Sequence, residues 1–385
     1  MPRLPIYLDC HATTPVDRRV LDRMLPYFTE TFGNPASSTH QWGWRAQEAV
    51  EQARREVAAL LGATPREMYF TSGATESNNL ALTGAWAARD AARSHIVVSA
   101  IEHKSVLEGA ERLERQGARV ARVPVTRDGI VDIEALRGVV GPETLLVSVM
   151  AANNEIGVVQ PLADVGAVAR AAGALFHVDA AQAVGKVPID VGAMQIDLLS
   201  LTGHKMYGPK GCGAVYVRKR TRLEPLIVGG GQERGMRSGT LNVPGIVGLG
   251  AACAICQTDM SEESARVARL RDRLLDGFRA GLDGVIVNGS MERRLPNNLH
   301  VSFTGVDGES LLIGIGDIAV SSGSACASAS GQPSHVLRAV MGGDAVPSAS
   351  IRFGLGRDTT DEDIDYTIGK FVSVIKHLRS TAPAR

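Results

Sequence analysis

Short apolar runs alternate with amphipathic stretches through the first two thirds of the chain. Four runs have the length and composition of buried strands; they are Met68 to Thr71, His95 to Ser99, Leu145 to Met150 and Ala174 to Val178. Between them, apolar positions at helical spacing predict helices from Ser105 to Gln116 and from Pro161 to Gly173. Buried strands that alternate with helices predict an α/β fold, in which a mostly parallel sheet has helices on both faces.

The pattern changes in the last third of the chain. A long helical segment runs from about Ser261 to Ala280, and shorter strands and a run of small residues follow it. We therefore expect a domain boundary near residue 258, with a second, smaller domain after it.

Composition narrows the class of protein. The 385 residues include 41 basic and 41 acidic side chains, and 44% of the residues are hydrophobic. A net charge of zero gives no reason to expect nucleic acid or an anionic membrane as the main partner. The first residues do not resemble a secretory signal, and no apolar run approaches the ~20 residues of a membrane span. We expect a cytoplasmic protein whose five cysteines are reduced.

Polar side chains directly follow several predicted strands. His103, Asn154, Asp179 and Lys205 each come just after a strand end. Because ligands of open α/β sheets bind at the carboxyl ends of the strands, we expect these four side chains to converge on one site. Residues 73–75, Gly-Ala-Thr at a helix start, offer N–H groups and a hydroxyl to a phosphate.

Lys205 lies 26 positions after Asp179 (205 − 179). Many pyridoxal phosphate (PLP) enzymes hold their cofactor with such a pair. The lysine forms a Schiff base, and the acid keeps the pyridine nitrogen protonated so that the ring accepts electrons. Taken singly, each residue has another explanation: Asp179 could cap a helix, His103 could be a satisfied loop histidine, and Lys205 could be a solvated surface lysine. The complete set and its order favour a cofactor site.

Cys326 lies in a run of Ser, Gly and Ala from Ser321 to Ser330. The alternative is a surface turn with an incidental thiol. Because nothing in this run would bury the thiol, we expect a nucleophile on a mobile loop. Cys253 and Cys256 form a Cys-x-x-Cys within a helical stretch that has no second ligand pair, so we expect no intrinsic metal site.

A close match to one family extends from Tyr7 to Arg357 and includes nine sequence blocks. They are Ala12–Pro15, Phe32–Pro35, Thr71–Ser77, Glu102–Lys104, Asn153–Gly157, His177–Gln182, Gly203–Lys205, Arg237–Thr240 and Ser321–Cys326. The chain resembles the cysteine desulfurases of the NifS/IscS type, in the class V aminotransferase group of fold-type I PLP enzymes. The resemblance implies a large domain, residues 15–258, with a mostly parallel seven-stranded sheet flanked by helices. It also implies a smaller α+β domain of residues 1–14 and 259–385, which carries a catalytic loop at about 319–334.

The same resemblance implies a role for each candidate site residue. Lys205 forms the Schiff base, Asp179 pairs with the ring nitrogen, and Cys326 is the nucleophile. His103 stacks on the ring and helps to transfer protons, and Gln182 and Asn154 hydrogen-bond around the ring's 3-oxygen. The phosphate is bound by Ala74, Thr75, Thr202 and His204, and Thr240 contacts the phosphate of the neighbouring subunit's cofactor. Arg352 and Asn154 bind the substrate.

The implied reaction removes sulfur from L-cysteine and leaves L-alanine and a persulfide on Cys326. The sulfur then passes to an iron–sulfur scaffold protein or another sulfur carrier, with tRNA thiolation as a further destination. The implied assembly is a homodimer with composite sites and no direct nucleic-acid or membrane partner. Any iron–sulfur cluster held through Cys326 is transient and shared with the scaffold.

Two alternatives remain open. The chain could be a selenocysteine lyase or another class V PLP enzyme, such as a kynureninase or an aminotransferase, or it could be a sulfur-relay platform that has lost catalysis.

The sequence departs from the family pattern in two places. It stops at Arg385, soon after the last predicted helix, whereas many members continue with a tail that docks the scaffold. Residues 332–335 also differ from the commonest sequence of the family at this place, so we expect the kinetics of the loop that carries Cys326 to differ.

Overall fold

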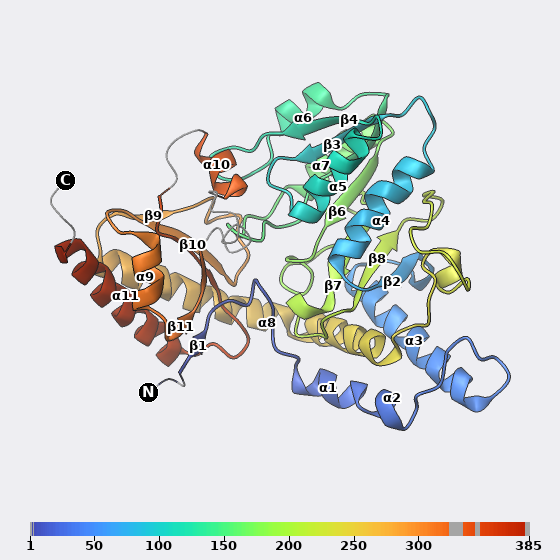
Figure 1. Ribbon diagram of the computed structural model, residues 1–385, viewed down its shortest axis with the longest axis horizontal. Coiled ribbons are helices and arrows are strands. Elements are labelled where there is room, and N and C mark those ends of the chain that lie inside the picture. The colour runs from blue at the N-terminus through green and yellow to red at the C-terminus, as the bar shows by residue number, and fades with distance from the viewer. Residues whose placement is uncertain (1, 3, 323–333, 343–346, 382–385) are drawn as a thin grey trace.

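A computed structural model describes residues 2, 4–322, 334–342 and 347–381 (Figure 1). Its main feature is a seven-stranded sheet in the order β2-β8-β7-β6-β5-β3-β4. The strands are β2 (Met68–Thr71), β3 (His95–Ser99), β4 (Arg119–Val123), β5 (Thr144–Ser148), β6 (Leu175–Asp179), β7 (Leu198–Thr202) and β8 (Gly213–Val217). Neighbouring strands are parallel except around β8, which is antiparallel to both β2 and β7. The prediction of a mostly parallel seven-stranded sheet is confirmed.

Helices cover both faces of this sheet. Ile96 and Val98 of β3 pack in one buried cluster with α4 (Ala74–Ala87) and α5 (Lys104–Glu114). Val97, which points to the opposite face, packs in a second cluster. The helices that contribute to this second cluster include α1 (Arg18–Met24), α3 (Gln41–Leu60), α6 (Ile133–Val139) and α7 (Leu162–Ala171); α2 (Pro26–Thr29) follows α1. Two buried faces explain why the strands are continuously apolar in sequence.

One long helix, α8 (Val243–Gly281), extends past both parts of the molecule (Figure 1). Its first half packs in the large-sheet cluster, and its second half, from Val267 to Phe278, packs with the smaller sheet. The predicted start of this helix near Ser261 was wrong. Glycines weaken the helical signal before that point, but they are needed for packing: a Cβ on Gly250 would lie 2.6 Å from the Cα of Ala53 in α3. Residue 258 lies inside α8, and the domain division there stays a prediction.

By length and composition alone, α8 also qualifies as a membrane-spanning helix. Its most apolar 18-residue window has a mean hydropathy of 1.3. However, 61% of that window is buried inside the structure, as is usual for a core helix. Its apolar character is therefore weak evidence for a membrane span.

The last third of the chain builds a four-stranded antiparallel sheet in the order β12-β13-β10-β9. Its strands are β9 (Val285–Val287), β10 (Asn298–Phe303), β12 (Ser321–Ser322) and β13 (Ser350–Gly354), and its helices are α9 (Gly308–Gly314), α10 (His335–Met341) and α11 (Asp361–Thr381). Four phenylalanine rings, with contacting centroids 5.1 to 5.9 Å apart, occupy the core: Phe278, Phe303, Phe353 and Phe371. The N-terminal strand β1 (Ile6–Tyr7) pairs with β11 (Ile318–Ala319), so the start of the chain packs on this part.

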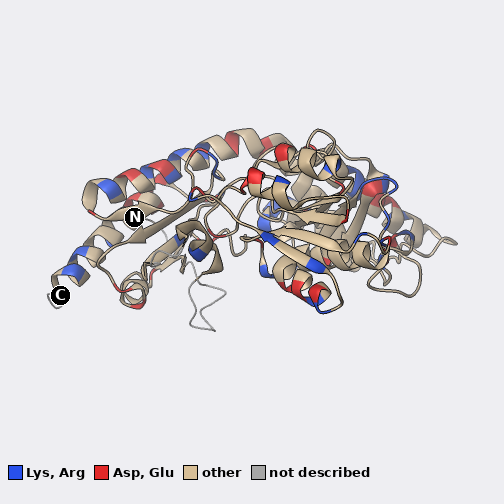
Figure 2. Ribbon diagram, turned by 90° about the horizontal axis from the view of Figure 1, so that it is seen from above, with Lys and Arg blue, Asp and Glu red and all other residues tan. Residues whose placement is uncertain are grey.

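Charged side chains of both signs are interspersed over the outer helices (Figure 2). On α8, for example, Arg273 pairs with Asp365 of α11 at 2.7 Å and with Asp361 at 3.1 Å. Mixed signs of this kind agree with the balanced composition of the chain.

Candidate active site

A cavity of about 740 Å³ opens at the carboxyl ends of the central parallel strands. Ten of the predicted site residues line it: Ala74, Thr75, His103, Asn154, Asp179, Gln182, Thr202, His204, Lys205 and Arg352. Thr240 does not line it and is exposed in the segment between β8 and α8. Cys326 lies outside the residues that the structure describes.

One end of the cavity is built from backbone groups. Gly73 has φ +151°, a conformation that side-chain-bearing residues rarely adopt, and α4 begins directly after it at Ala74. A Cβ at Gly73 would lie 3.5 Å from the hydroxyl oxygen of Thr202. The start of α4 and the side chains of Thr75 and Thr202 thus line the same cavity, an arrangement that suits a phosphate.

His204 lies near this end of the cavity. Its Nδ1 is 3.2 Å from the hydroxyl of Thr13. Burial, followed by the charges of Lys205, Lys210 and Lys186, lowers the pKa of His204 to about 4. The imidazole is therefore neutral near pH 7, and it offers hydrogen bonds rather than a positive charge to a group bound in the cavity.

Asp179 ends β6 and is only 4% exposed. Its Oδ1 accepts a hydrogen bond from the backbone N–H of Ala181 at 2.9 Å, and its Oδ2 accepts from Nδ2 of Asn78 at 2.7 Å. Asn78 lies in α4, three residues after Thr75, and is completely buried. These bonds orient the carboxylate toward the cavity that it lines.

His103 is oriented by Ser105, the second residue of α5. The backbone N–H of Ser105 donates to Nδ1 of His103 at 3.2 Å, and the hydroxyl of Ser105 is 2.8 Å from the same nitrogen. Because a backbone N–H can only donate, Nδ1 is an acceptor, and the proton of the neutral ring is on Nε2. Asn78 donates to the Ser105 hydroxyl at 2.9 Å, which links this group to Asp179.

Lys205 ends a 3₁₀ turn that follows β7. Its Nζ donates to the backbone carbonyls of His11 and Ala12, the latter at 2.6 Å. Burial, followed by the positive charges of Lys186 and Arg352, lowers the pKa of Lys205 to about 7. A large fraction of this amine is therefore unprotonated and nucleophilic at neutral pH.

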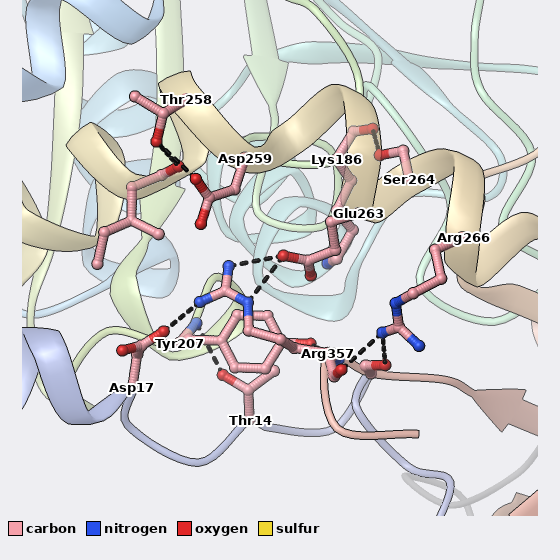
Figure 3. A network of polar contacts seen from close by, with 12 residues as sticks. Thr14, Asp17, Lys186, Tyr207, Thr258, Asp259, Glu263, Ser264, Arg266 and Arg357 are labelled. Carbon is pink, nitrogen blue, oxygen red and sulfur yellow. Dashed lines mark hydrogen bonds and ion pairs between the residues drawn. The ribbon is translucent and has the colours of Figure 1, made fainter. Parts of the chain in front are cut away.

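The loop after Lys205 is held by an ion-pair network (Figure 3). Tyr207 has φ +63°, a value uncommon for a residue other than glycine. Its hydroxyl accepts from the backbone N–H of Arg357 at 2.6 Å, and the Arg357 guanidinium lies 4.3 Å from the centre of its ring. Arg357 pairs in turn with Asp17 and with Glu263 of α8. The network thus ties the lysine loop to three distant segments of the chain.

Arg352 lies on β13 and also lines the cavity. Its Nη1 donates to the backbone carbonyl of Asn154 at 2.9 Å, and its Nη2 donates to Asp9 at 2.7 Å and to the hydroxyl of Ser321 at 3.0 Å. Its buried Nε has no hydrogen-bond partner. The guanidinium is therefore fixed in orientation and retains a free donor.

Several residues of this site were not predicted from the sequence. Asp9, His11 and Glu155 line the cavity, and Asn78 supports Asp179. Burial raises the pKa of Glu155 to about 7, and the hydroxyl of Ser334 donates to its carboxyl group. Of these four, Asn78 and Glu155 had a usable signal, because Asn78 is one turn after Thr75 on the same helix and Glu155 follows Asn154 within the matching block Asn153–Gly157.

The cysteines that the structure describes are all buried free thiols: Cys10, Cys212, Cys253 and Cys256. Burial raises the pKa of Cys10 and Cys212 to about 12 and that of Cys256 to about 11. These three thiols are therefore protonated and unreactive near neutral pH. Within the described ranges, no three His, Cys, Asp or Glu side chains are grouped so that they could hold a metal ion.

The fold and the site together define a class of protein. The family model "Aminotransferase class-V" matches residues 6–367, and the chain belongs to this family of PLP-dependent enzymes. Within it, the chain is 53% identical to "Cysteine desulfurase IscS" of Anaeromyxobacter sp. (strain K) over 383 residues, 99% of this chain and 95% of that protein. It is 50% identical to "Cysteine desulfurase" of Homo sapiens over 381 residues, 98% of this chain and 83% of that protein. The resemblance inferred from the sequence motifs is confirmed.

Solved structures agree with this assignment. A "NifS-like protein" superposes with a TM-score of 0.90 at 40% identity and covers 97% of this chain and 100% of its own. "SspA in complex with cysteine" superposes with a TM-score of 0.81 at 39% identity, covering 91% of this chain and 98% of that chain. The predicted fold-type I architecture is confirmed by these neighbours.

Proposed function

We propose that this protein is a PLP-dependent cysteine desulfurase, which converts L-cysteine to L-alanine and carries the released sulfur on Cys326. The observation that supports this most is the meeting of Lys205, Asp179 and the start of α4 in one cavity, which Arg352 also lines. The identity of 50–54% to cysteine desulfurases over nearly the whole chain supports the same reaction.

The cavity fits this cofactor by the chemistry of its donors and acceptors. Asp179 offers a fixed carboxylate to a protonated ring nitrogen, and Lys205 offers an amine to an aldehyde. The glycine turn before α4 offers N–H groups to a phosphate. When bound, PLP supplies an electron sink that stabilises negative charge at the substrate Cα.

The protein's own groups bind and orient the substrate and move its protons. Arg352 pairs with the carboxylate of L-cysteine, since a planar guanidinium suits a bidentate contact. Lys205 removes the Cα proton, because an amine with a pKa of about 7 is a competent base at neutral pH. The Cys326 thiolate then attacks the substrate sulfur, which forms the S–S bond of a persulfide and breaks the C–S bond of the substrate. The electron pair of the broken bond stays with the carbon fragment, which takes up protons to become L-alanine.

The remaining lining residues hold the cofactor. Ala74, Thr75, Thr202 and His204 bind the phosphate, His103 covers the ring, and Gln182 and Asn154 hydrogen-bond near its 3-oxygen. Their shared cavity supports these roles.

The proposed assembly is a cytoplasmic homodimer that passes sulfur to an iron–sulfur scaffold protein or another sulfur carrier. Thr240 is exposed and does not line its own subunit's cavity, which supports a contact with the neighbouring subunit's phosphate. Sedimentation equilibrium tests the dimer. If it forms, Thr240→Ala should weaken PLP binding without changing the dimer mass.

The test of the function begins with the visible spectrum of the purified protein after PLP is added. L-cysteine and a reductant are then supplied, and sulfide and alanine are measured. We expect a visible absorption band and equimolar sulfide and alanine. A band without sulfide would point to another amino acid substrate, and no band would overturn the cofactor assignment.

Two cysteine variants complete the test. Cys326→Ser should keep the absorption band and abolish sulfide production. Cys256→Ala, which removes a buried thiol outside the cavity, should retain both. Full sulfide production by Cys326→Ser would overturn the role of Cys326.

A further inference from the structure

His11 is a buried histidine that the proposed chemistry does not use. It follows β1, is only 1% exposed, and lines the cavity. Both ring nitrogens lie within hydrogen-bonding distance of side-chain amides: Nδ1 is 2.9 Å from Oε1 of Gln182, and Nε2 is 3.1 Å from Nδ2 of Asn298. Two neutral amides on the two nitrogens indicate a ring with a defined tautomer, which the surrounding donors can identify.

The guanidinium of Arg294 identifies which atom of the Asn298 amide is the donor, and thereby the direction of these hydrogen bonds. A guanidinium can only donate, and Nη1 of Arg294 lies 2.9 Å from Oδ1 of Asn298. The other atom of that amide, Nδ2, is therefore a donor, and it donates to the backbone carbonyl of Glu155 at 3.0 Å and to Nε2 of His11. Nε2 is consequently an acceptor, and the proton of the neutral ring is on Nδ1.

The proton on Nδ1 fixes the next amide in the chain. Nδ1–H of His11 donates to Oε1 of Gln182. Nε2 of Gln182 donates back to the backbone carbonyl of His11 at 2.9 Å. Oε1 of Gln182 is thus directed toward His11, and Nε2 keeps one further hydrogen beside the cavity that Gln182 lines.

We infer that His11 is a positioning residue, which holds the Gln182 side chain so that it meets the bound cofactor as an N–H donor. The inference rests on the proposed function, because the acceptor that Gln182 would meet is the 3-oxygen of PLP. Without the Nδ1–H group of His11, only the bond from Nε2 to the backbone carbonyl of His11 would hold the Gln182 amide, so the orientation that presents its oxygen to that site would become more populated.

The neutral state of His11 agrees with its surroundings. Burial, together with the nearby positive charges of Lys186, Arg352 and Lys205, holds the pKa of His11 well below its usual range. Among the charged groups that influence this ring, all three act against a second proton. The ring therefore keeps one donor and one acceptor at neutral pH.

Two substitutions separate the nitrogens of His11. In His11→Asn, the amide nitrogen can take the place of Nδ1 and keep a donor for Gln182. In His11→Gln, the amide reaches the place of Nε2, which keeps the contact with Asn298 but removes the donor to Gln182. The two variants are thus matched in polarity, and each keeps a different one of the two hydrogen bonds of the ring.

The first readout is the pH dependence of the visible absorption of the PLP-loaded protein. An N–H donor stabilises negative charge on the 3-oxygen, so its loss should raise the pH midpoint. We expect an increase of roughly one pH unit in His11→Gln and a much smaller change in His11→Asn. Equal shifts in both variants, or no shift in His11→Gln, would overturn the inference.

The second readout does not require a bound cofactor. The ¹⁵N chemical shifts of the His11 ring, assigned by the signal that His11→Asn loses, report its tautomer in the purified wild-type protein. We expect protonated Nδ1 and unprotonated Nε2; protonated Nε2 would overturn the inference even if His11→Gln failed to fold. If the wild-type protein bound no PLP, the proposed function would fail, while the ring tautomer would still decide the role of His11.

Discussion

Asp9 and Arg352 form an ion pair of 2.7 Å at the edge of the cavity, with side chains that are 17% and 8% exposed. Asp9 follows the first strand of the chain, and Arg352 lies on β13, 343 positions later. Ser321 also contacts both, since its hydroxyl donates to Asp9 at 2.9 Å and accepts from Arg352 at 3.0 Å. The guanidinium is therefore oriented before any substrate arrives.

Arg352→Lys should reveal the role of this orientation. Lysine keeps the positive charge but not the planar pair of donors, so binding of the substrate carboxylate should weaken. We expect the KM for L-cysteine to rise at least tenfold, roughly the worth of one charged hydrogen bond, with a smaller change in kcat. Initial rates of alanine formation measure both constants. Arg273→Lys on the outer surface of α8 is the matched control, and an unchanged KM in Arg352→Lys would contradict the assignment.

The pKa of Lys205 predicts the pH dependence of cofactor capture. Only the unprotonated amine reacts with the PLP aldehyde, and burial and nearby charge lower the pKa of Lys205 from 10.5 to about 7. The rate of capture should therefore rise through pH 7 and reach a plateau by roughly pH 8, one unit above the pKa. Stopped-flow absorbance after mixing the PLP-free protein with PLP measures this rate.

A variant of Lys186 tests the cause of this pH profile of the capture rate. Its positive charge is the second cause, after burial, of the lowered pKa of Lys205. Lys186→Met should move the midpoint of the profile to higher pH, whereas Lys219→Met, at the surface, should leave it in place. A profile that still rises steeply above pH 9 in the wild-type protein would show that the amine is not perturbed.

The strand-end residues could be predicted because their signal is local. A buried strand followed at once by a polar residue is visible in sequence, and parallel topology brings such ends together. His103, Asn154, Asp179 and Lys205 all line the cavity for this reason.

Asp9 and His11 could not be found in this way. They reach the cavity because β1 pairs with β11, a contact between segments more than 300 positions apart that leaves no periodic pattern. The extent of α8 was hidden for a related reason: close packing against α3, which only small residues permit, outweighs the weak helix propensity of its glycines. Non-local contacts thus account for both failures.

His177 should make the protein sensitive to mild acid. It is fully buried between the hydroxyls of Ser148 and Ser200, and burial lowers its pKa from 6.5 to about 3. Below pH 6.5, His177 binds a proton in the unfolded chain but stays neutral in the folded protein until the pH approaches 3. Stability is therefore present above pH 6.5 and is lost as the pH falls from 6.5 toward 3, by about 1.4 kcal/mol per pH unit.

His177→Gln should reduce this loss. Between pH 8 and pH 5.5, we expect its free energy of unfolding in urea to fall by about 1.4 kcal/mol less than that of the wild-type protein. Exposed His377 on α11 offers the control, because His377→Gln should follow the wild-type curve. Parallel curves for all three proteins would show that His177 is protonated in the folded state.

Arg54 and Glu233 form a buried ion pair that should dominate the stability of the segment before Thr240. Their side chains are 3% and 1% exposed, and two N–H···O bonds of 2.7 and 2.8 Å join them. Glu233 also accepts from the backbone N–H of Phe70 at 2.7 Å and has φ +49°, so the pair holds an unusual turn against α3 and β2. Glu233→Gln leaves the buried Arg54 charge with only the half-exposed Glu51 as a counter-ion, and it should lower the free energy of unfolding by about 3 kcal/mol.

The exposed pair of Arg18 and Asp22 is the matched control for this experiment. It has a similar separation of 2.9 Å, but its side chains are 79% and 54% exposed. Because solvent screens such a pair, Asp22→Asn should leave the Tm nearly unchanged. Thermal unfolding, followed by circular dichroism, measures the shift in Tm that Glu233→Gln and Asp22→Asn each cause. Equal and small shifts would show that the buried pair contributes little. A large shift for Glu233→Gln alone, accompanied by weaker dimerisation, would show that the pair also positions the segment that carries Thr240.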